Sequence, residues 1–152
     1  MKLAEALLFR ADANKRVHEL QARLQRSARV QEGDTAPENP LELLDELTRT
    51  VAELTRFVKQ INRTNAQTAF DEGRTLTDAL ADRDALTLEF GVLSATIAQA
   101  TMQAQGYNAS PIKVFRAINV AEVQKRTDDL ARQRRDLDTR IQALNWTVDL
   151  IE

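Results

Sequence analysis

The sequence predicts an all-α protein built from four long helices in antiparallel helical hairpins. Three observations predict this class. The chain of 152 residues contains only four Gly and three Pro, so few residues interrupt its regular elements. Its composition is rich in Ala, Leu, Arg, Glu and Gln, which favour helix. Apolar residues recur in steps of three and four over long stretches, as they do along one face of a helix.

The length of the chain fits one domain with a sizeable core. We expect residues 1–152 to form a single helical domain with helices at about 2–30, 40–67, 76–105 and 120–149. Each helix would then be roughly 40 Å long at 1.5 Å per residue.

Apolar stripes predict the first two helices. The stripe of the helix at 2–30 is Leu3, Leu7, Val17, Leu20, Leu24 and Ala28. The helix at 40–67 carries an unbroken coiled-coil seam, formed by Leu44, Leu47, Val51, Leu54, Val58, Ile61 and Asn65. A seam of this kind packs against a partner helix. Asn39 can cap the second helix, with Pro40 at its first position.

The third helix, at 76–105, is apolar on two sides. One stripe is Leu76, Leu80, Leu86, Phe90, Leu93, Ile97 and Ala100, and the second is Leu88, Val92, Ala95 and Met102. A helix with two apolar sides lies in the centre of a bundle or at a subunit interface. Gly91 lies inside this helix, where Gly lowers helix stability by about 1 kcal/mol relative to Ala. Close approach of another helix would be one reason for a Gly at this position.

The fourth helix, at 120–149, carries one long stripe with two polar members. The stripe is Val120, Val123, Thr127, Leu130, Arg134, Leu137, Ile141, Leu144, Val148 and Ile151. Thr127 and Arg134 are the polar members, and they interrupt an otherwise apolar seam. Asn119 with Glu122 resembles a capping box at the start of this helix.

Two topologies fit four such helices. Their connections favour antiparallel neighbours, so an up–down–up–down bundle is the simplest arrangement. The alternative is a bent pair of long hairpins that completes its core only in an oligomer. The two-sided third helix favours this alternative, and we expect a homo-oligomer. The connection at 106–118 contains β-branched and aromatic residues, which predict a short strand or an ordered loop.

Antiparallel order would gather polar residues from several helix ends at one pole of the bundle. The candidate residues of this polar pole are Asn62, Arg63, Asn65, Arg74, Asn145 and Trp146. They could form a binding surface on the helix ends. In the alternative interpretation they cap helix termini, and Trp146 is a packing anchor.

Charged residues at apolar seams predict a second polar feature, further inside the helices. The candidate residues of this Arg/Asp layer are Arg10, Asp12, Arg83, Asp84, Arg134 and Asp138. A charge at a seam must be paired or solvated, because burying an unpaired charge is costly. The layer could bind an anion or a metal, or it could be an ion-pair layer that sets the register of the helices.

The sequence predicts no catalytic residues and no cofactor. It contains a single His, His18, whereas carboxylate-bridged di-iron bundles need paired Glu-x-x-His motifs. There is no Cys, which excludes disulfides, thiolate metal sites and Cys nucleophiles. Ligands for zinc hydrolysis are lacking, and no phosphate-binding loop, dinucleotide-binding or nucleophile-elbow motif occurs.

Neither nucleic acid nor a membrane is an expected partner. The net charge of −2 disfavours nucleic-acid binding through bulk charge. A local basic surface is the alternative, consisting of Lys15, Arg16, Lys113, Arg116, Lys125 and Arg126, with Tyr107 and Phe115 nearby for base stacking. No apolar run approaches the ~18 residues that span a bilayer, and charges interrupt the apolar start of the chain. We therefore expect a cytoplasmic protein.

Four stretches carry a resemblance to a known family: KLAEALLFRADANKRVHELQARL, INRTN, GRTLTDALADRD and LNWTVDL. They resemble an uncharacterised family of small bacterial helical proteins, some of which are labelled septicolysin-like. The resemblance covers most of the chain and implies an oligomeric helical bundle, but it assigns no catalytic residue. A membrane-active cytolysin is the least favoured function, because these amphipathic helices can bury their apolar faces against each other.

The sequence therefore predicts a non-enzymatic structural or interaction protein that forms a helical homo-oligomer. The feature that motivates this prediction is the second apolar stripe of the helix at 76–105. An anion- or metal-binding protein that uses the Arg/Asp layer is one alternative. A nucleic-acid-binding helical protein is the other. The sequence does not identify a ligand.

Overall fold

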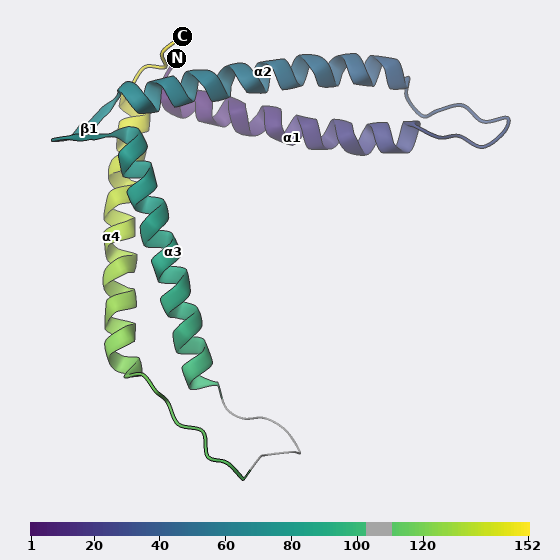
Figure 1. The fold of residues 1–152 in the computed structure, drawn as a ribbon. Coiled ribbons are helices and arrows are strands. Elements are labelled where there is room, and N and C mark those ends of the chain that lie inside the picture. Colours follow the sequence, from purple (N-terminus) through teal and green to yellow (C-terminus); the bar gives the residue numbers. More distant parts are fainter. Residues whose placement is uncertain (103–110) are drawn as a thin grey trace. The chain divides into compact units, whose positions relative to one another are not determined.

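The computed structural model describes residues 1–102 and 111–152, which form long helices and one small antiparallel sheet (Figure 1). The helices are α1 (Leu3–Ser27), α2 (Pro40–Gln67), α3 (Leu76–Thr101) and α4 (Val120–Thr147). The strands are β1 (Ala69–Asp71) and β2 (Arg74–Thr75). Within the described residues, the prediction of a mostly helical protein with four long helices is confirmed.

Two of the helices begin at the caps that the sequence predicts. The side chain of Asn39 accepts a hydrogen bond of 3.0 Å from the backbone N–H of Leu41, and Pro40 is the first residue of α2. The side chain of Asn119 accepts a hydrogen bond of 3.2 Å from the backbone N–H of Glu122 at the start of α4. Each cap satisfies a backbone donor that has no partner inside the helix.

Two helices end earlier than predicted. α1 ends at Ser27 and not at residue 30, and residues 28–30 are exposed. α4 ends at Thr147 and not at residue 149, because Asp149 leaves the helix to form an antiparallel bridge with Lys2.

The third connection is described only in part. α3 ends at Thr101, and the predicted helical residues 103–105 lie outside the described residues. The same holds for residues 106–110 of the predicted strand or ordered loop. Residues 111–118 belong to no helix or strand, so no strand forms in the described part of this connection.

The described chain divides into two compact units. The α1–α2 unit consists of Met1–Leu76 and Gln142–Glu152, and it contains the small sheet. The α3–α4 unit consists of Thr77–Ile141. The expected single domain, and the choice between one bundle and two hairpins, stay predictions.

The core of the α1–α2 unit lies between two antiparallel helices (Figure 1). From α1 it takes Leu3, Ala4, Ala6, Ala13 and Leu20, and from α2 it takes Leu43, Thr50, Phe57, Ile61 and Thr64. The rings of Phe9 and Phe57 stack with their centroids 5.7 Å apart. Burying a large side chain of this kind contributes about 1.5–3 kcal/mol.

The predicted seam of α2 is only partly buried within the α1–α2 unit. Ile61 is buried, but Leu44, Val51 and Val58 are exposed by 47%, 42% and 37%. The buried stripe of α2 lies one position away, at Leu43, Thr50, Phe57 and Thr64. The reason lies in α1: the stack of Phe57 on Phe9, and the ion pairs of Glu46 described below, turn this neighbouring face of α2 towards α1.

Both chain termini belong to the α1–α2 unit and are joined by backbone hydrogen bonds. The N–H of Leu3 donates to the carbonyl of Val148, and the N–H of Leu150 donates to the carbonyl of Met1, each at 2.9 Å. The N–H of Ile151 donates to the hydroxyl of Thr64, which is fully buried in α2, also at 2.9 Å. The last residues of the chain therefore attach both to its start and to α2.

A short β-hairpin, which the sequence patterns did not predict, separates α2 from α3. β1 and β2 pair across a turn that contains Gly73, whose φ of +82° favours glycine. The Arg74 guanidinium pairs with the Asp71 carboxylate at 2.5 Å and lies 5.5 Å from the centroid of the Phe70 ring. The hairpin thus reverses the chain before α3 begins.

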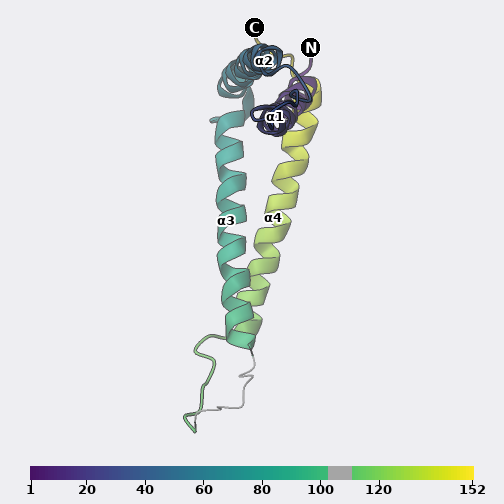
Figure 2. The same ribbon diagram turned by 90° about the vertical axis from the view of Figure 1, so that its right-hand side faces the viewer.

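The α3–α4 unit consists of two antiparallel helices that lie side by side (Figure 2). The stripe predicted for α4 is buried at Thr127, Leu130, Leu137 and Ile141. The first predicted stripe of α3 is half-buried along most of its length, whereas the second stripe is exposed. An ion pair between Arg126 and Glu89 joins the two helices.

Crossing a bilayer requires a helix that is both long and predominantly apolar. No helix in the described part of the chain combines these two properties.

Candidate functional site

Four of the six residues in the predicted Arg/Asp layer lie in the α3–α4 unit. The Arg83 guanidinium donates through Nε and Nη2 to Oδ1 of Asp84, at 3.2 and 2.9 Å. Its Nη1 atom lies 3.6 Å from Oδ1 of Asp138 on α4. The Arg134 guanidinium lies 5.2 Å from the centroid of the Phe90 ring, a cation–π contact between the two helices. Arg83 is therefore paired with carboxylates, and Arg134 lies against an aromatic ring. These contacts offset the cost of burying a charge at the seam.

These side chains surround a cavity of about 320 Å³. It is lined by Arg83, Thr87, Arg134, Arg135 and Asp138. The lining carries three guanidinium groups against one carboxylate, so the cavity has a positive charge. Guanidinium groups bind carboxylate and phosphate oxygens through paired N–H donors. Arg83 already pairs with Asp84 and Asp138, so the guanidinium groups of Arg134 and Arg135 supply the remaining positive charge at the cavity.

The other two residues of the predicted layer lie in the α1–α2 unit. Arg10 and Asp12 are both exposed on α1. Asp12 lines a separate cavity of about 370 Å³ between α1 and α2, together with Lys15, Arg16 and Glu53 among others. The predicted layer is therefore divided, with four of its residues in the α3–α4 unit and two in the α1–α2 unit.

All six residues of the predicted polar pole lie in the α1–α2 unit, and they differ in burial and in contacts. Arg63 donates to the backbone carbonyl of Glu152. Arg74 belongs to the β-hairpin, and Asn145 is buried. Asn62 is exposed and Asn65 is half-buried. Trp146 is 58% exposed, so it is not a packing anchor within the described chain.

The basic residues of the nucleic-acid alternative mostly have partners in their own unit. On α1, Lys15 lies 3.8 Å from Glu19 and Arg16 lies 2.6 Å from Glu46. In the α3–α4 unit, Arg126 pairs with Glu89, and Arg116 donates to the backbone carbonyl of Ala100. These contacts neutralise part of the charge that would attract a phosphate backbone. Tyr107 lies outside the described residues.

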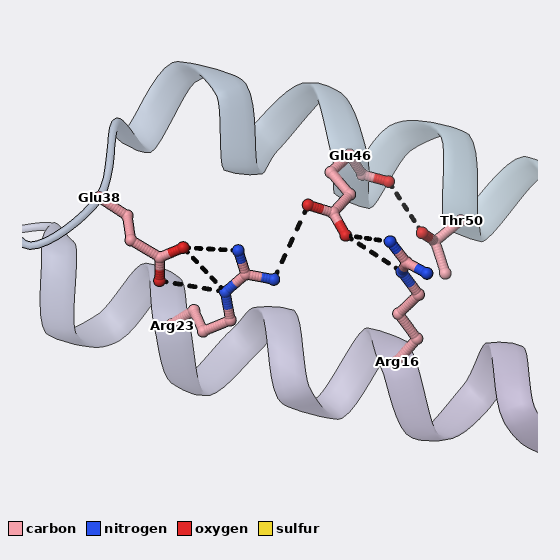
Figure 3. Close-up of polar contacts among 5 residues, drawn as sticks. All are labelled: Arg16, Arg23, Glu38, Glu46 and Thr50. Atoms are coloured by element: carbon pink, nitrogen blue, oxygen red, sulfur yellow. Dashed lines mark hydrogen bonds and ion pairs between the residues drawn. The ribbon is translucent and has the colours of Figure 1, made fainter.

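An ion-pair cluster between α1 and α2 was not predicted from the sequence (Figure 3). Arg23 donates through Nε to both carboxylate oxygens of Glu38, at 3.1 and 3.0 Å. Arg16 donates to Glu46 at 3.0 and 2.6 Å, and Arg23 lies 3.7 Å from the same carboxylate. The signal that could have indicated it was the seven-residue spacing of Arg16 and Arg23, which places both on one face of α1.

The charges in this cluster stabilise each other. The hydrogen bond from Arg23 lowers the pKa of the Glu38 carboxyl. The same contact raises the pKa of Arg23, because each group favours the charged form of the other. With two arginines matched by two carboxylates, the cluster joins α1 to α2 and leaves no free charge for a ligand (Figure 3).

No group of three or more His, Asp or Glu among residues 1–102 and 111–152 is arranged to hold a metal ion.

The outer face of α3 carries exposed apolar side chains. They are Leu88 and Val92; Met102 follows directly after the end of α3, and the segment after the undescribed residues adds Ile112, Val114 and Phe115. A groove of about 1040 Å³ runs between the C-terminal half of α3 and this segment. Arg116 holds the segment there, because its Nε donates to the carbonyl of Ala100 at 3.0 Å.

Comparison with known proteins places the chain in a family. The family model described as "Family of unknown function (DUF6847)" matches residues 10–150. The chain belongs to this family. A crystal structure of a functionally unknown conserved protein from Corynebacterium diphtheriae is similar to the DUF6847 chain, with 42% sequence identity and a TM-score of 0.93. The match covers 99% of this chain and 99% of that chain, and no curated protein matches.

The DUF6847 match includes every residue of the predicted polar pole and Arg/Asp layer, which lie between Arg10 and Trp146. Neither the description of the family nor that of the crystal structure names an activity, a ligand or a partner. The septicolysin-like label appears in neither description, so it stays a resemblance of the sequence alone.

Proposed function

We propose that this DUF6847 protein is a non-enzymatic helical interaction protein that forms a homo-oligomer through the outer face of α3. The observation that carries the proposal is the exposure of apolar side chains on this face. Leu88, Val92 and Met102 are exposed by 71%, 57% and 69%. A contiguous apolar surface of this kind marks an interaction site, because exposing it to water is costly.

A second copy of the chain is the partner that this face fits. Leu88, Val92, Ala95, Gln99 and Met102 follow alternating steps of four and three, which is the spacing of a coiled-coil seam. Such a seam packs against another helix with the same spacing. Gly91 borders the seam, and an added Cβ there would meet no atom within 4 Å, so a second helix has room to approach closely.

Charge favours an antiparallel arrangement of the two copies. The first half of α3 contains three acidic residues, Asp78, Asp82 and Asp84, against the single cation Arg83, and Glu89 follows at the middle of the helix. Two cations, Lys113 and Arg116, follow its C-terminal half. An antiparallel pair brings the acidic half of each helix beside the cations of the other copy, whereas a parallel pair brings like charges together.

The solution mass of the purified protein tests this proposal. We expect wild type to exceed its monomer mass of 17.1 kDa in light scattering, and Leu88→Glu with Val92→Glu to reduce the assembly. Val30→Glu is the matched control, because Val30 is an exposed valine outside both helices of the α3–α4 unit. A wild-type monomer, or an assembly that the double variant leaves intact, would contradict the proposal.

The arginine-lined cavity supports a second candidate function, the binding of a small anion. Three guanidinium groups with one carboxylate form a cavity whose size suits a phosphate or a carboxylate group. Arg135 is exposed at the edge of the cavity, where it can bind a ligand without loss of packing.

Titration calorimetry with inorganic phosphate tests this second candidate. Arg135→Ala should weaken phosphate binding, because it removes one of the three cations. Arg132→Ala is the control, since Arg132 is an exposed arginine on the same helix that pairs with Asp129 and does not line the cavity. Equal losses in the two variants, or no binding by wild type, would rule the candidate out.

A further inference from the structure

Three residues of the predicted coiled-coil seam of α2 face away from α1. Leu44, Val51 and Val58 are exposed at intervals of seven residues along one side of the helix. The half-buried side chains of Leu47 and Leu54 lie at its margin. This is the most regular heptad pattern in the sequence, yet no helix of the α1–α2 unit covers it. We infer that this outer face of α2 is a second self-docking surface, on which α2 of another copy packs in antiparallel orientation.

The face can be removed from water at little cost. Thr48 and Thr55 share it with the apolar residues, because they lie four residues after Leu44 and Val51. The Thr48 hydroxyl donates to the carbonyl of Leu44 at 3.0 Å, and the Thr55 hydroxyl donates to the carbonyl of Val51 at 2.8 Å. Both hydroxyl donors are satisfied within α2, so a covering helix leaves neither of them unpaired.

The charges of α2 are divided between its two halves. The half at 40–53 contains four acidic residues, Glu42, Asp45, Glu46 and Glu53, against one cation, Arg49. The half at 54–67 contains three cations, Arg56, Lys59 and Arg63, and no acidic residue. Glu46 pairs with two arginines of α1, so Glu42, Asp45 and Glu53 carry the remaining acidic charge of this half.

This division of charge selects a second copy in antiparallel orientation. An antiparallel pair places the acidic half of each α2 beside the basic half of the other, and a parallel pair opposes like charges. With Val51 beside the partner's Val51, the equal seven-residue spacing brings Leu44 beside the partner's Val58. The same register brings Asp45 within reach of the partner's Lys59, at the edge of the apolar contact.

The cations of α2 also border a groove that can receive the partner's carboxylates. The groove has a volume of about 500 Å³ and is lined by Arg56, Lys59 and Arg63 together with Ala52, Thr55, Gln60 and Glu152. Arg63 already donates to the backbone carbonyl of Glu152, so Arg56 and Lys59 are the cations that can receive the partner's carboxylates. It adjoins the apolar face through Thr55. A protein partner with both an apolar stripe and an acidic flank matches this surface, and the first half of α2 itself carries both features.

Single cysteines can test the orientation, because the chain has no Cys of its own. In the antiparallel pair, Val51→Cys places two thiols near the two-fold axis, where a disulfide can form. Leu44→Cys places its two thiols at opposite ends, about 20 Å apart at 1.5 Å per residue, which is too far for a disulfide. We expect a covalent dimer with Val51→Cys, none with Leu44→Cys alone, and a cross-linked pair when Leu44→Cys and Val58→Cys chains are mixed.

The cross-linking is performed on the full chain carrying Leu88→Glu and Val92→Glu, which separates this inference from the proposed α3 interface. Retention of the Val51→Cys dimer in that background supports the α2 surface whether or not the α3 interface exists. Equal cross-linking by Leu44→Cys indicates a parallel pair and overturns the inference. Failure of Val51→Cys to cross-link, with a monomer mass in light scattering, overturns it as well.

A charge exchange provides an independent check of the same register. Lys59→Asp alone should weaken the dimer in the Leu88→Glu and Val92→Glu background, because it brings like charges together. Combining Asp45→Lys with Lys59→Asp should restore the dimer, because the two charges are exchanged across the interface. Absence of this rescue would contradict the antiparallel register.

Discussion

The guanidinium of Arg23 holds the carboxylate of Glu38 by hydrogen bonds of 3.1 and 3.0 Å from its Nε atom (Figure 3). Glu38 lies in the connection just before α2, so the contact joins α1 to the point at which α2 begins. The Nη1 atom of the same arginine lies 3.7 Å from the carboxylate of Glu46, which is more than one helical turn after the start of α2. This single side chain therefore sets the position of the start of α2 along α1.

The stability of the protein should depend on pH through Glu38. The hydrogen bond from Arg23 lowers the pKa of Glu38 in the folded state, so the folded state binds the proton less readily than the unfolded chain. The stabilisation is fully present above the unfolded pKa of about 4.3 and is lost as pH falls through the lower folded pKa. Glu38→Gln should therefore destabilise the protein near neutral pH and have little effect at acid pH.

Urea unfolding midpoints of wild type and Glu38→Gln, measured on both sides of this pH range, check the prediction. Glu32→Gln is the control, because Glu32 is an exposed glutamate in the same connection for which no contact of this kind is described. A difference between wild type and Glu38→Gln that stays constant with pH would show that the Arg23 contact contributes nothing to stability.

Removing the hydroxyl of Thr64 should loosen the C-terminal end of the chain. Thr64 is fully buried, and its hydroxyl accepts from the N–H of Ile151 while donating to the carbonyl of Gln60. Thr64→Val keeps the shape but leaves a buried N–H without a partner, at a cost of about 1–3 kcal/mol. Equilibrium unfolding measures the cost, and hydrogen exchange of the Ile151 amide reports the local opening.

The matched control for this variant is Thr139→Val. Thr139 is exposed on α4, and its hydroxyl donates only to the carbonyl of Arg135 in the same helix. Its loss should change the free energy of unfolding by no more than about 0.5 kcal/mol. Equal effects of the two variants would exclude a special role for the contact between Thr64 and Ile151.

Truncation of α2 should distinguish its buried face from its exposed face. Phe57 is 3% exposed and stacks on Phe9, so Phe57→Ala should destabilise the α1–α2 unit by about 3–5 kcal/mol. Val51 is exposed, so Val51→Ala should cost much less in the monomer. Denaturant unfolding at low protein concentration measures both. A larger loss for Val51→Ala would reverse the assignment of the two faces.

Replacement of Gly91 should separate the stability of α3 from its proposed role in association. An added Cβ meets no atom within 4 Å, so Gly91→Ala should stabilise the helix by about 1 kcal/mol, the difference in helix propensity. If another copy of α3 approaches closely at this point, the added methyl group should at the same time weaken association. Unfolding measurements and light scattering on the same variant report the two effects separately.

Local signals in the sequence predicted the helices well. The side chains of Asn39 and Asn119 cap α2 and α4 as expected, because a cap depends only on residues within one turn. The stripe of α4 was also predicted, since its helix has one dominant apolar side. The end of α4 was predicted two residues too late, because Asp149 and Leu150 pair with the distant chain start.

The candidate site could be predicted only in part. Arg83 and Asp138 do lie close together, as the seam positions of the arginines suggested. Arg10 and Asp12, counted into the same layer, lie on exposed positions of the other unit. The height of a residue along its helix can be counted from the sequence. The sequence does not show which helices are neighbours, or which side of a helix faces its neighbour.

The positions of the four helices, apart from two of their ends, and the two apolar sides of α3 followed from the sequence, because propensity, capping and apolar spacing act within a few residues. The tertiary structure alone decided which side of α2 meets α1. The regular seam of Leu44, Val51 and Val58 was the stronger pattern, yet the stack of Phe57 on Phe9 and the pairing of Glu46 with two arginines favour the adjacent face. These contacts join residues more than twenty positions apart, so their energy becomes available only when the two helices are side by side.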